Sequence, residues 1–520
     1  MTECSRRIRR IKCDEEQPNC GQCTRGRRIC DGYVNSSPAG HELKYFSTLL
    51  TTSGVHTLLG TDQERRCFDY FCRRTVAQLS GSFDSAFWDQ LLLQATHHEP
   101  AVWHAVVALG SLHQNFEQRH ISMKREDDVF AVKQYVKAIG FVLMPVRDRG
   151  KQAADVALMT CILFICFEIL RGYHSAALSH IDGGVKIVSE LLSCQSNTSL
   201  SIPAIPYIPL TLLKQMFSRL DAQASQISNG RPRHLLCANL STTSSTYDAK
   251  IPISFQSFEA ASDGLDCIRT CATQAIQSLP PPSSIADPPL PTHAETKLSL
   301  DLIRNSSAIR LTQWSSAFDG LLDDRKNFVS EADRRKIQFL KLHHILTGVN
   351  YNIGFVRARS DEMMWDSYIQ EFRAMLGYAK ELLNLTKIRR QPVFMLDTEV
   401  ILPLFFVAVK CRDGEVRRQA ISLLRSQWRQ EGVWNSFLAA KVAERVVQIE
   451  EGGINGIEVI AADVLRRKRV LGVEVKLDLE QRRANLSYVK LKENGGIEYI
   501  NEWVRWTSFG FDASITGENV

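Results

Sequence analysis

The sequence has no uninterrupted apolar run long enough to cross a membrane as a helix. Its longest such run, Val156 to Phe167, ends at Glu168, whereas a spanning helix needs roughly 18 residues. The N-terminal residues are rich in arginine and lack the apolar segment of a signal peptide. We therefore expect a protein of a reducing compartment with no membrane partner, in which a disulfide framework is disfavoured.

The motifs of the common enzyme classes are also missing. We find no G-x-S-x-G, no P-loop, no H-E-x-x-H and no dinucleotide fingerprint beside an expected strand. Four histidines lie close together, but no acidic residue completes a metal-ligand set at helical spacing, so we interpret them as ordinary helix or loop residues. They are His97, His98, His104 and His113. These absences predict that the chain is not an enzyme.

What the sequence does have is a basic N-terminal head on a nearly neutral body. The 520 residues carry a net charge of +6. Residues 1–33 contain eight Lys and Arg against five Asp and Glu, a net +3, so the other 487 residues carry only the remaining +3. A charge concentrated in this way predicts an anionic partner that meets the N-terminus.

Composition divides the chain after this head. Residues 34–60 are rich in Ser, Thr and Gly and predict a flexible linker. Over residues 61–520 apolar residues recur at helical intervals, which predicts one large α-helical domain. Within it, Val156–Phe167 is apolar on all sides and predicts a central, buried helix. A proline-rich stretch predicts a loop over residues 270–300.

Near the C-terminus the apolar periodicity changes from helical to alternating. Val473, Val475 and Leu477 alternate with polar residues, and Leu486 and Tyr488 do the same after a polar turn. A period of two is typical of strands, so this segment predicts a small β-hairpin. The expected fold is therefore mainly α-helical, with one short β-hairpin near its C-terminal end.

Three short patterns mark expected ends or bends of helices. The pair Gly183-Gly184 interrupts a helical pattern and predicts a break or bend. Asp413 precedes another helical pattern and predicts its N-cap. The basic run Leu465–Arg469 has two interpretations, a solvated helix end or a second nuclear localisation signal.

Cysteines are concentrated in the head, where five of the fourteen lie within the first 30 residues. They are Cys4, Cys13, Cys20, Cys23 and Cys30. Two thiolates separated by two residues can bind one metal ion from a tight turn, and Zn²⁺ takes four ligands in a tetrahedron. The head therefore predicts a zinc site. The other nine cysteines lie mostly among apolar residues and are expected to be buried free thiols.

Residues 7–33, RIRRIKCDEEQPNCGQCTRGRRICDGY, resemble the fungal binuclear zinc-cluster transcription factors, in which six cysteines hold two Zn²⁺ ions. The likeness rests on Lys12-Cys13-Asp14, Pro18-Asn19-Cys20 and Cys30-Asp31-Gly32-Tyr33. The family has a further Cys-x2-Cys pair that would fall at positions 3 and 6, where this sequence has only Cys4 between them. Three alternatives follow: Cys4 completes a two-zinc cluster, the cluster is degenerate and holds one zinc or none, or a missing upstream segment supplies the pair.

The resemblance also implies a role for the basic residues of the head. By their offset from Cys13, Arg9 and Arg10 match the base-reading positions of the family, and Arg7 and Lys12 match its phosphate contacts. Bidentate contact of arginine with guanine suits the CGG triplets that such clusters read. The implied function is zinc-dependent, sequence-specific DNA binding that regulates RNA polymerase II transcription in the nucleus. The basic run can also be a nuclear localisation signal, alone or in addition.

The body resembles the helical regulatory domain that accompanies these clusters. The stretches that carry this likeness include FAVKQYVKAI and ILPLFFVAVKCRDGEVRRQAISLL. The implied partners are double-stranded DNA, transcriptional co-regulators and a second copy of the chain. The residues after the head contain no heptad repeat, so we do not expect a coiled-coil dimer. The alternative function, from a different class, is a regulatory or interaction scaffold whose degenerate cluster no longer binds DNA.

Overall fold

The computed structural model describes most of the chain after residue 59. The described residues are 60–83, 86–118, 128–149, 152–193, 200–201, 203–227, 251–277, 294–325, 330–354, 362–385, 391–452, 459–478, 483–492, 496–505 and 516–519. The chain divides into the units Met1–Gly60 and Thr61–Val520, and the architecture below is that of the second unit. The expected zinc cluster and nearly all of the expected linker lie outside the described residues.

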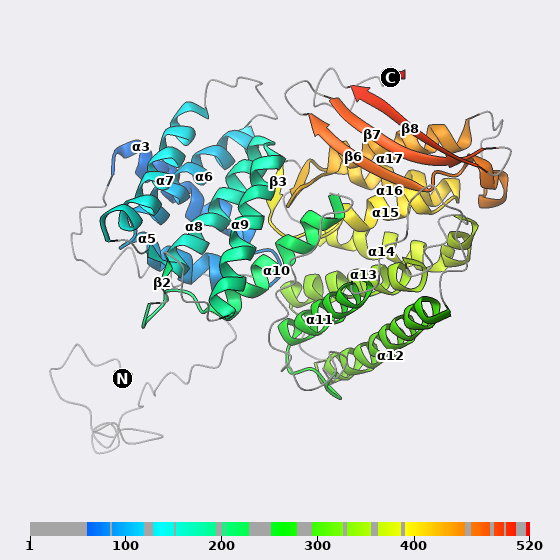
Figure 1. Cartoon of the computed structure of the whole chain (residues 1–520), viewed down its shortest axis with the longest axis horizontal. Coiled ribbons are helices and arrows are strands. Elements are labelled where there is room, and N and C mark those ends of the chain that lie inside the picture. The colour runs from blue at the N-terminus through cyan, green and yellow to red at the C-terminus, as the bar shows by residue number, and fades with distance from the viewer. Residues whose placement is uncertain are drawn as a thin grey trace, which may run out of the picture. The chain divides into compact units, whose positions relative to one another are not determined.

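The fold is mainly α-helical, as the sequence predicts, and its first part is a helical bundle (Figure 1). The helices of this bundle are α3 (Asp62–Tyr70), α4 (Val76–Leu79), α5 (Leu92–Thr96), α6 (Pro100–Gln118), α7 (Val129–Arg149), α8 (Ala154–Arg171), α9 (His174–Leu192) and α10 (Leu210–Ile227). Two π-helical turns, Phe71–Thr75 and Ala86–Leu91, precede α4 and α5. Two short strands, β1 (Gln152–Ala153) and β2 (Leu200–Ser201), pair with each other in the parallel direction.

Helix α8 forms the centre of the bundle, and the prediction of a central, buried helix is confirmed. It packs against α6, α7, α9 and α10, and nearly every residue of Val156–Phe167 is buried. A helix that is apolar on all sides can bury its whole surface only if other helices surround it. It ends at Gly172, whose φ of 80° is the left-handed conformation that glycine adopts without steric cost.

The break expected at Gly183-Gly184 is absent, because α9 runs unbroken from His174 to Leu192. The structure assigns Gly184 a packing role instead. A Cβ atom at Gly184 would lie 2.0 Å from a ring carbon of Phe217 on α10, whereas one at Gly183 would meet nothing within 4 Å. Gly184 therefore permits α9 and α10 to approach closely, and the pair does not end a helix.

The chain continues into three longer helices, α11 (Phe258–Gln277), α12 (Ala294–Asp324) and α13 (Glu331–Gly354), which enclose an apolar core of their own. Trp314 lies at its centre and donates a hydrogen bond of 2.7 Å to the Ala261 carbonyl. The segment between α11 and α12 is shorter at both ends than the proline-rich loop expected over 270–300, because α11 reaches Gln277 and α12 begins at Ala294. The six prolines of this stretch fall at 280–291, so the flanking residues are free to continue the helices.

A third group of helices follows and encloses another core. It comprises the 3₁₀ segment Glu362–Tyr368 and the helices α14 (Ile369–Leu385), α15 (Ile401–Lys410), α16 (Gly414–Ser426) and α17 (Ser436–Glu451). The predicted N-cap is confirmed, because the Asp413 side chain accepts a hydrogen bond of 3.0 Å from the backbone of Val416. Asn435 caps α17 in the same way.

The alternating segment forms strands, and the predicted hairpin is part of a larger antiparallel sheet. Its strands are β6 (Gly472–Asp478), β7 (Arg483–Leu491), β8 (Ile497–Arg505) and β9 (Thr516–Asn519), in that order. Val473 pairs with Tyr488 and Val475 with Leu486, so the predicted residues share one face. That face packs on the third core, and it is covered by the helices beside it (Figure 1).

A small three-stranded sheet connects the first bundle to the third group of helices. Strand β3 (Val393–Met395) runs parallel to β4 (Arg429–Glu431), which pairs with β5 (Trp434–Asn435) in the antiparallel direction. Phe394, Leu396 and Val433 are buried in the core of the first bundle, although they come from the C-terminal part of the chain. The two parts therefore share a core at this sheet.

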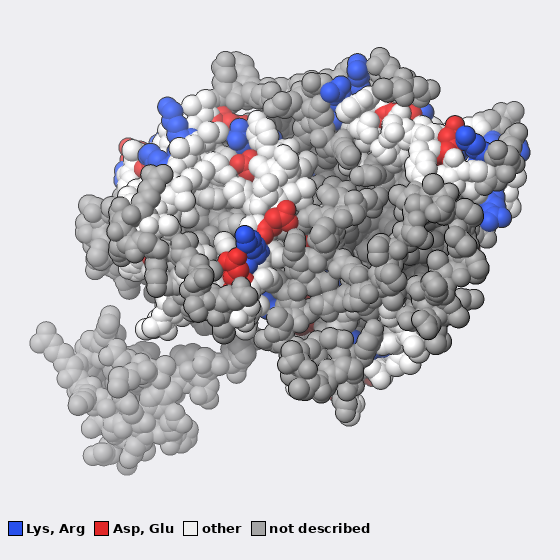
Figure 2. Space-filling view, in the orientation of Figure 1, with Lys and Arg blue, Asp and Glu red and all other residues white. Residues whose placement is uncertain are grey.

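Helix α7 is apolar, yet little of it is buried. Its window Val129–Val146 has the length and composition of a membrane span, and 22% of that window is buried. One face of it nevertheless packs along α6, with Ala131 and Ala138 buried in the bundle core. On the molecular face shown in Figure 2, acidic and basic side chains of the described residues are interspersed, in keeping with a nearly neutral body.

Candidate functional site

The site residues predicted from the sequence all belong to the head and lie outside the described residues. The predicted zinc ligands are Cys4, Cys13, Cys20, Cys23 and Cys30, and the predicted DNA contacts are Arg7, Arg9, Arg10 and Lys12. Their arrangement stays a prediction. The structure describes instead the helical body. Within this body, three groups of buried charged residues are each held together by hydrogen bonds.

Two of the four histidines that lie close together in the sequence, His104 and His113, have ordinary structural partners. His113 is fully buried, and its Nδ1 lies 2.9 Å from the Thr75 hydroxyl. Burial lowers the pKa of His113 to about 4 and keeps its ring neutral at pH 7. His104 contacts the side-chain oxygen of Gln134 at 2.6 Å. Across the described residues, no group of three or more His, Cys, Asp or Glu is placed to hold a metal ion.

The first group of buried charges surrounds Glu117 at the end of α6. Its carboxylate accepts hydrogen bonds from Tyr70, from Arg74 at 3.0 Å and from Gln78 at 2.6 Å. Burial and the negative charge of Glu117 together raise the pKa of Tyr70. Gln78 also accepts a hydrogen bond of 2.6 Å from the backbone of Phe394, so this group fastens β3 to the bundle.

The second group lies at the small sheet and closes around Arg429. Its guanidinium donates to Glu431 at 2.8 Å and to Glu399 at 2.7 Å, and Arg335 of α13 binds Glu399 from the other side. The second oxygen of Glu431 accepts the backbone N–H groups of Glu399, Val400 and Ile401 at 2.8 to 2.9 Å. Free N–H groups at the start of a helix attract negative charge, so Glu431 holds the beginning of α15 in place.

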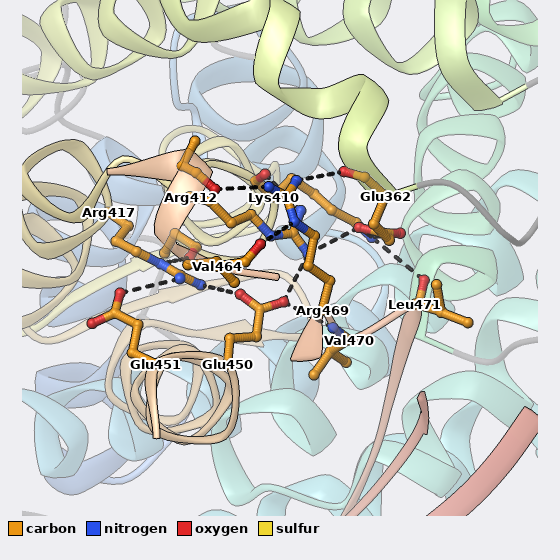
Figure 3. A network of polar contacts seen from close by, with 12 residues as sticks. Glu362, Lys410, Arg412, Arg417, Glu450, Glu451, Val464, Arg469, Val470 and Leu471 are labelled. Carbon is orange, nitrogen blue, oxygen red and sulfur yellow. Dashed lines mark hydrogen bonds and ion pairs between the residues drawn. The ribbon is translucent and has the colours of Figure 1, made fainter. Parts of the chain in front are cut away.

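The third group, which we call the interior charge network, links α15, α16 and α17 (Figure 3). At its centre Glu450 accepts hydrogen bonds from Arg412 at 2.7 Å and from Arg417 at 2.9 Å, and all three side chains are fully buried. Glu362 binds Arg412 at 3.0 Å and Lys410 at 2.8 Å. Each buried cation therefore lies against a carboxylate.

The interior charge network also holds the segment that leads into the sheet. Arg469 is fully buried and donates to both carboxylate oxygens of Asp366 at 2.7 and 2.8 Å, as well as to three backbone carbonyls. The Val470 backbone donates to Glu450 at 2.9 Å. The interpretation of Leu465–Arg469 as a solvated helix end is wrong at its last residue, because a planar guanidinium can saturate many acceptors inside a protein.

The electrostatics of the network follow from its pairing. Burial alone would raise the pKa of Glu450, but the positive charges of Arg412 and Arg417 hold it below its usual value. Burial lowers the pKa of Lys410, and Glu362 only partly restores it. Each of these carboxylates accepts hydrogen bonds from two or more donors. Such a network suits a rigid scaffold, and within it no group is arranged for catalysis.

Single-sequence patterns missed all three groups. Charged residues usually mark a solvated surface, and many of the paired residues lie far apart in the chain, as with Arg469 and Asp366, which are 103 residues apart. One signal was available: Lys410 and Arg412 follow the apolar run ILPLFFVAV without a turn motif between them. Cations so close to an apolar helix need buried acidic partners or an exit to solvent.

Part of this architecture is similar to a known protein family. Residues 66–324 match the fungal specific transcription factor domain. The match begins within α3 and ends at the last residue of α12, so it covers the first bundle and two of the three longer helices. The interior charge network lies beyond its end. No solved structure matches the chain.

Two curated proteins are similar to this chain. The aspercryptin biosynthesis cluster-specific transcription regulator of Emericella nidulans is 23% identical over 605 aligned positions, which cover 96% of this chain and 95% of that protein. A transcription regulator of Purpureocillium lilacinum is 28% identical over 207 residues, covering 35% of this chain and 48% of that protein. The matched family and both relatives are named as transcription factors or regulators and not as enzymes, which confirms the expectation that the chain is not an enzyme.

Proposed function

We propose that the chain is a nuclear, sequence-specific, DNA-binding transcription regulator that reads CGG-type half-sites through a zinc cluster in residues 1–33. The observation that carries this proposal is the conjunction of two independent features. The cysteine and arginine spacing of the head resembles a DNA-reading module, and residues 66–324 match a fungal specific transcription factor domain. The likeness to a named transcription regulator over nearly the whole chain supports it further.

In this proposal the head binds DNA and the helical body regulates the activity. Arg9 and Arg10 would read bases, whereas Arg7 and Lys12 would bind phosphates and supply affinity that weakens as salt rises. The rigid body, with its buried ion pairs, would present fixed surfaces to co-regulators or to a second copy of the chain. Catalysis has no part in this function.

The test measures zinc content and DNA binding on the full chain. We expect two zinc ions per chain and a preference for CGG-containing duplex over scrambled duplex that weakens with salt. Cys20→Ser should lose zinc, whereas the matched control Cys72→Ser, which changes a half-buried thiol of the bundle, should retain it. Zero or one zinc ion together with equal binding to both duplexes would contradict the proposal.

The same assay separates base reading from phosphate contact. Arg10→Ala should relax specificity at one base position by about 1–3 kcal/mol, because a bidentate contact is lost. Lys12→Ala should weaken binding to all duplexes alike and reduce the salt dependence. Equal losses on every duplex for both variants would refute this division of roles.

One observation favours a second candidate function, a regulatory or interaction scaffold that does not bind DNA. The head has Glu3 and Arg6 at the positions where the resemblance requires cysteines, and Cys4 is out of register with both. A zinc-free head that nevertheless leaves the helical body folded, as judged by its circular dichroism, would support this candidate.

A further inference from the structure

Two cysteines on α11 lie close enough to act together. Cys267 and Cys271 are four residues apart, so they lie on the same face of the helix, and their sulfur atoms are 4.0 Å apart. Cys267 is half-buried, and Cys271 is buried with 7% exposure.

A buried cation completes this arrangement. Arg310 of α12 is 8% exposed, and its hydrogen bonding and its charge both lower the pKa of the Cys271 thiol. The hydrogen bond from Cys267 and the guanidinium of Arg310 lower the pKa of Cys271 to about 6, although burial opposes this shift. At neutral pH a thiol with such a pKa is mostly thiolate, the form that reacts as a nucleophile.

Apart from Cys267, the other cysteines that the structure describes have the opposite character. Burial raises the pKa of Cys72 and of Cys161 to about 12 and that of Cys411 to about 11. These residues are free thiols, of which Cys411 is buried and Cys72 and Cys161 are half-buried. Cys271 differs because a second thiol and a guanidinium both stabilise its anion.

We propose that Cys267 and Cys271 form an oxidant-reactive dithiol, in which Cys271 attacks hydroperoxides and Cys267 resolves the product. The Cys271 thiolate attacks one peroxide oxygen, the O–O bond breaks, and the leaving oxygen takes a proton to depart as an alcohol or as water. Cys271 is then a sulfenic acid. The Cys267 sulfur, on losing its proton, displaces hydroxide from it, and the products are a disulfide and water.

The geometry of the helix should strain this disulfide. Residues four apart on a helix have Cβ atoms about 5–6 Å apart, whereas a relaxed disulfide needs about 3.5–4.5 Å. Closing the bond therefore tightens one turn of α11. Leu265 and Ile268 on the same helix pack into the core around Trp314, so oxidation should alter this core, and reducing agents should readily reverse the change.

The first test is site-resolved alkylation of the intact chain at pH 7. We expect Cys271 to react with iodoacetamide about tenfold faster or more than Cys72, because only the thiolate reacts. Arg310→Met should slow Cys271 and leave Cys72 unchanged, with circular dichroism confirming that the variant is folded. Equal alkylation rates for Cys271 and Cys72 in the wild-type chain would overturn the proposal without requiring any variant.

The second test identifies the oxidation products. Trypsin cleaves after Arg269, between the two cysteines, so a disulfide joins two peptides that mass spectrometry detects as one species. With hydrogen peroxide we expect this species in the wild-type chain and in Cys72→Ser. Cys267→Ser should instead accumulate a sulfenic acid on Cys271 that dimedone traps. If peroxide produces no linked peptide in the wild type and no dimedone adduct in Cys267→Ser, the dithiol is not reactive.

Discussion

The core of α3 to α10 is built mainly from apolar side chains, whereas the core around α15 to α17 also contains fully buried arginines. In the part of the chain that the structure describes, these arginines are Arg412, Arg417, Arg429 and Arg469. The first bundle has buried carboxylates too, but the arginine that pairs with Glu117, Arg74, keeps 35% exposure. The C-terminal core therefore depends on the pairing of buried charges more than the first bundle does.

This difference determines how each region responds to substitution. A buried ion pair adds little stability over an apolar pair, but removal of one partner leaves a buried charge without compensation. A close-packed apolar core is instead sensitive to volume, because side chains there have little room to move. The C-terminal core should therefore be damaged most by loss of charge, and the N-terminal core by added atoms.

The largest effect should come from Glu450→Gln. This change keeps the shape of the side chain and removes the negative charge that lies between Arg412 and Arg417. We expect the free energy of unfolding to fall by about 3–5 kcal/mol, measured from the denaturant midpoint of the full chain. The control is Glu381→Gln on the exposed side of α14, which should change it by less than about 0.5 kcal/mol. Similar stabilities for the two variants would remove the contrast between the cores.

A smaller effect of volume should appear in α9. Gly184→Ala places a methyl group against the Phe217 ring and should destabilise the bundle by about 1–3 kcal/mol. Gly183→Ala is its matched control on the exposed side of the same helix, and it should stabilise by about 0.5–1 kcal/mol, because alanine is the better helix former. Thermal unfolding of both variants measures this. If both variants are destabilised, the cause is a general effect of alanine in α9 and not the contact with Phe217.

The smallest effect should be a pH dependence that His113 contributes. Its pKa is about 4 in the folded chain, below the usual value of about 6.5, so the unfolded chain binds a proton first as the pH falls. The contribution is complete above about pH 6.5 and declines towards pH 4, by at most about 1.4 kcal/mol per pH unit. His113→Gln should flatten this decline in unfolding titrations, whereas the exposed His97→Gln should keep the wild-type slope. An unchanged slope in His113→Gln would show that other groups carry the dependence.

Patterns of apolar residues predicted the backbone of this fold well. The run Val156–Phe167 could be placed at the centre because no polar face was available to meet solvent, and the alternation of Val473, Val475 and Leu486 could only fit strands. Asp413 could be predicted as an N-cap because capping depends on neighbours three residues away. Such features are local, so a single sequence contains them.

Features that depend on distant partners could not be predicted in this way. Whether Arg469 is buried depends on Asp366, and whether Gly184 ends a helix depends on Phe217, and neither partner is close in the sequence. The candidate site in residues 1–33 could be predicted only because its cysteines and arginines are all local to one another. Its geometry lies outside the described residues, so that prediction stands on spacing and resemblance.

Strand β3 has a consequence for the order in which the chain can fold. Gln78 and Phe394 are hydrogen-bonded although they are 316 positions apart, and Phe394 and Leu396 complete the core of the first bundle. During synthesis, this bundle therefore stays incomplete until residue 396 has left the ribosome, long after its own helices have emerged. We expect nascent chains arrested at residue 324 to be cleaved by protease within α4, and chains that extend to residue 452 to resist cleavage there.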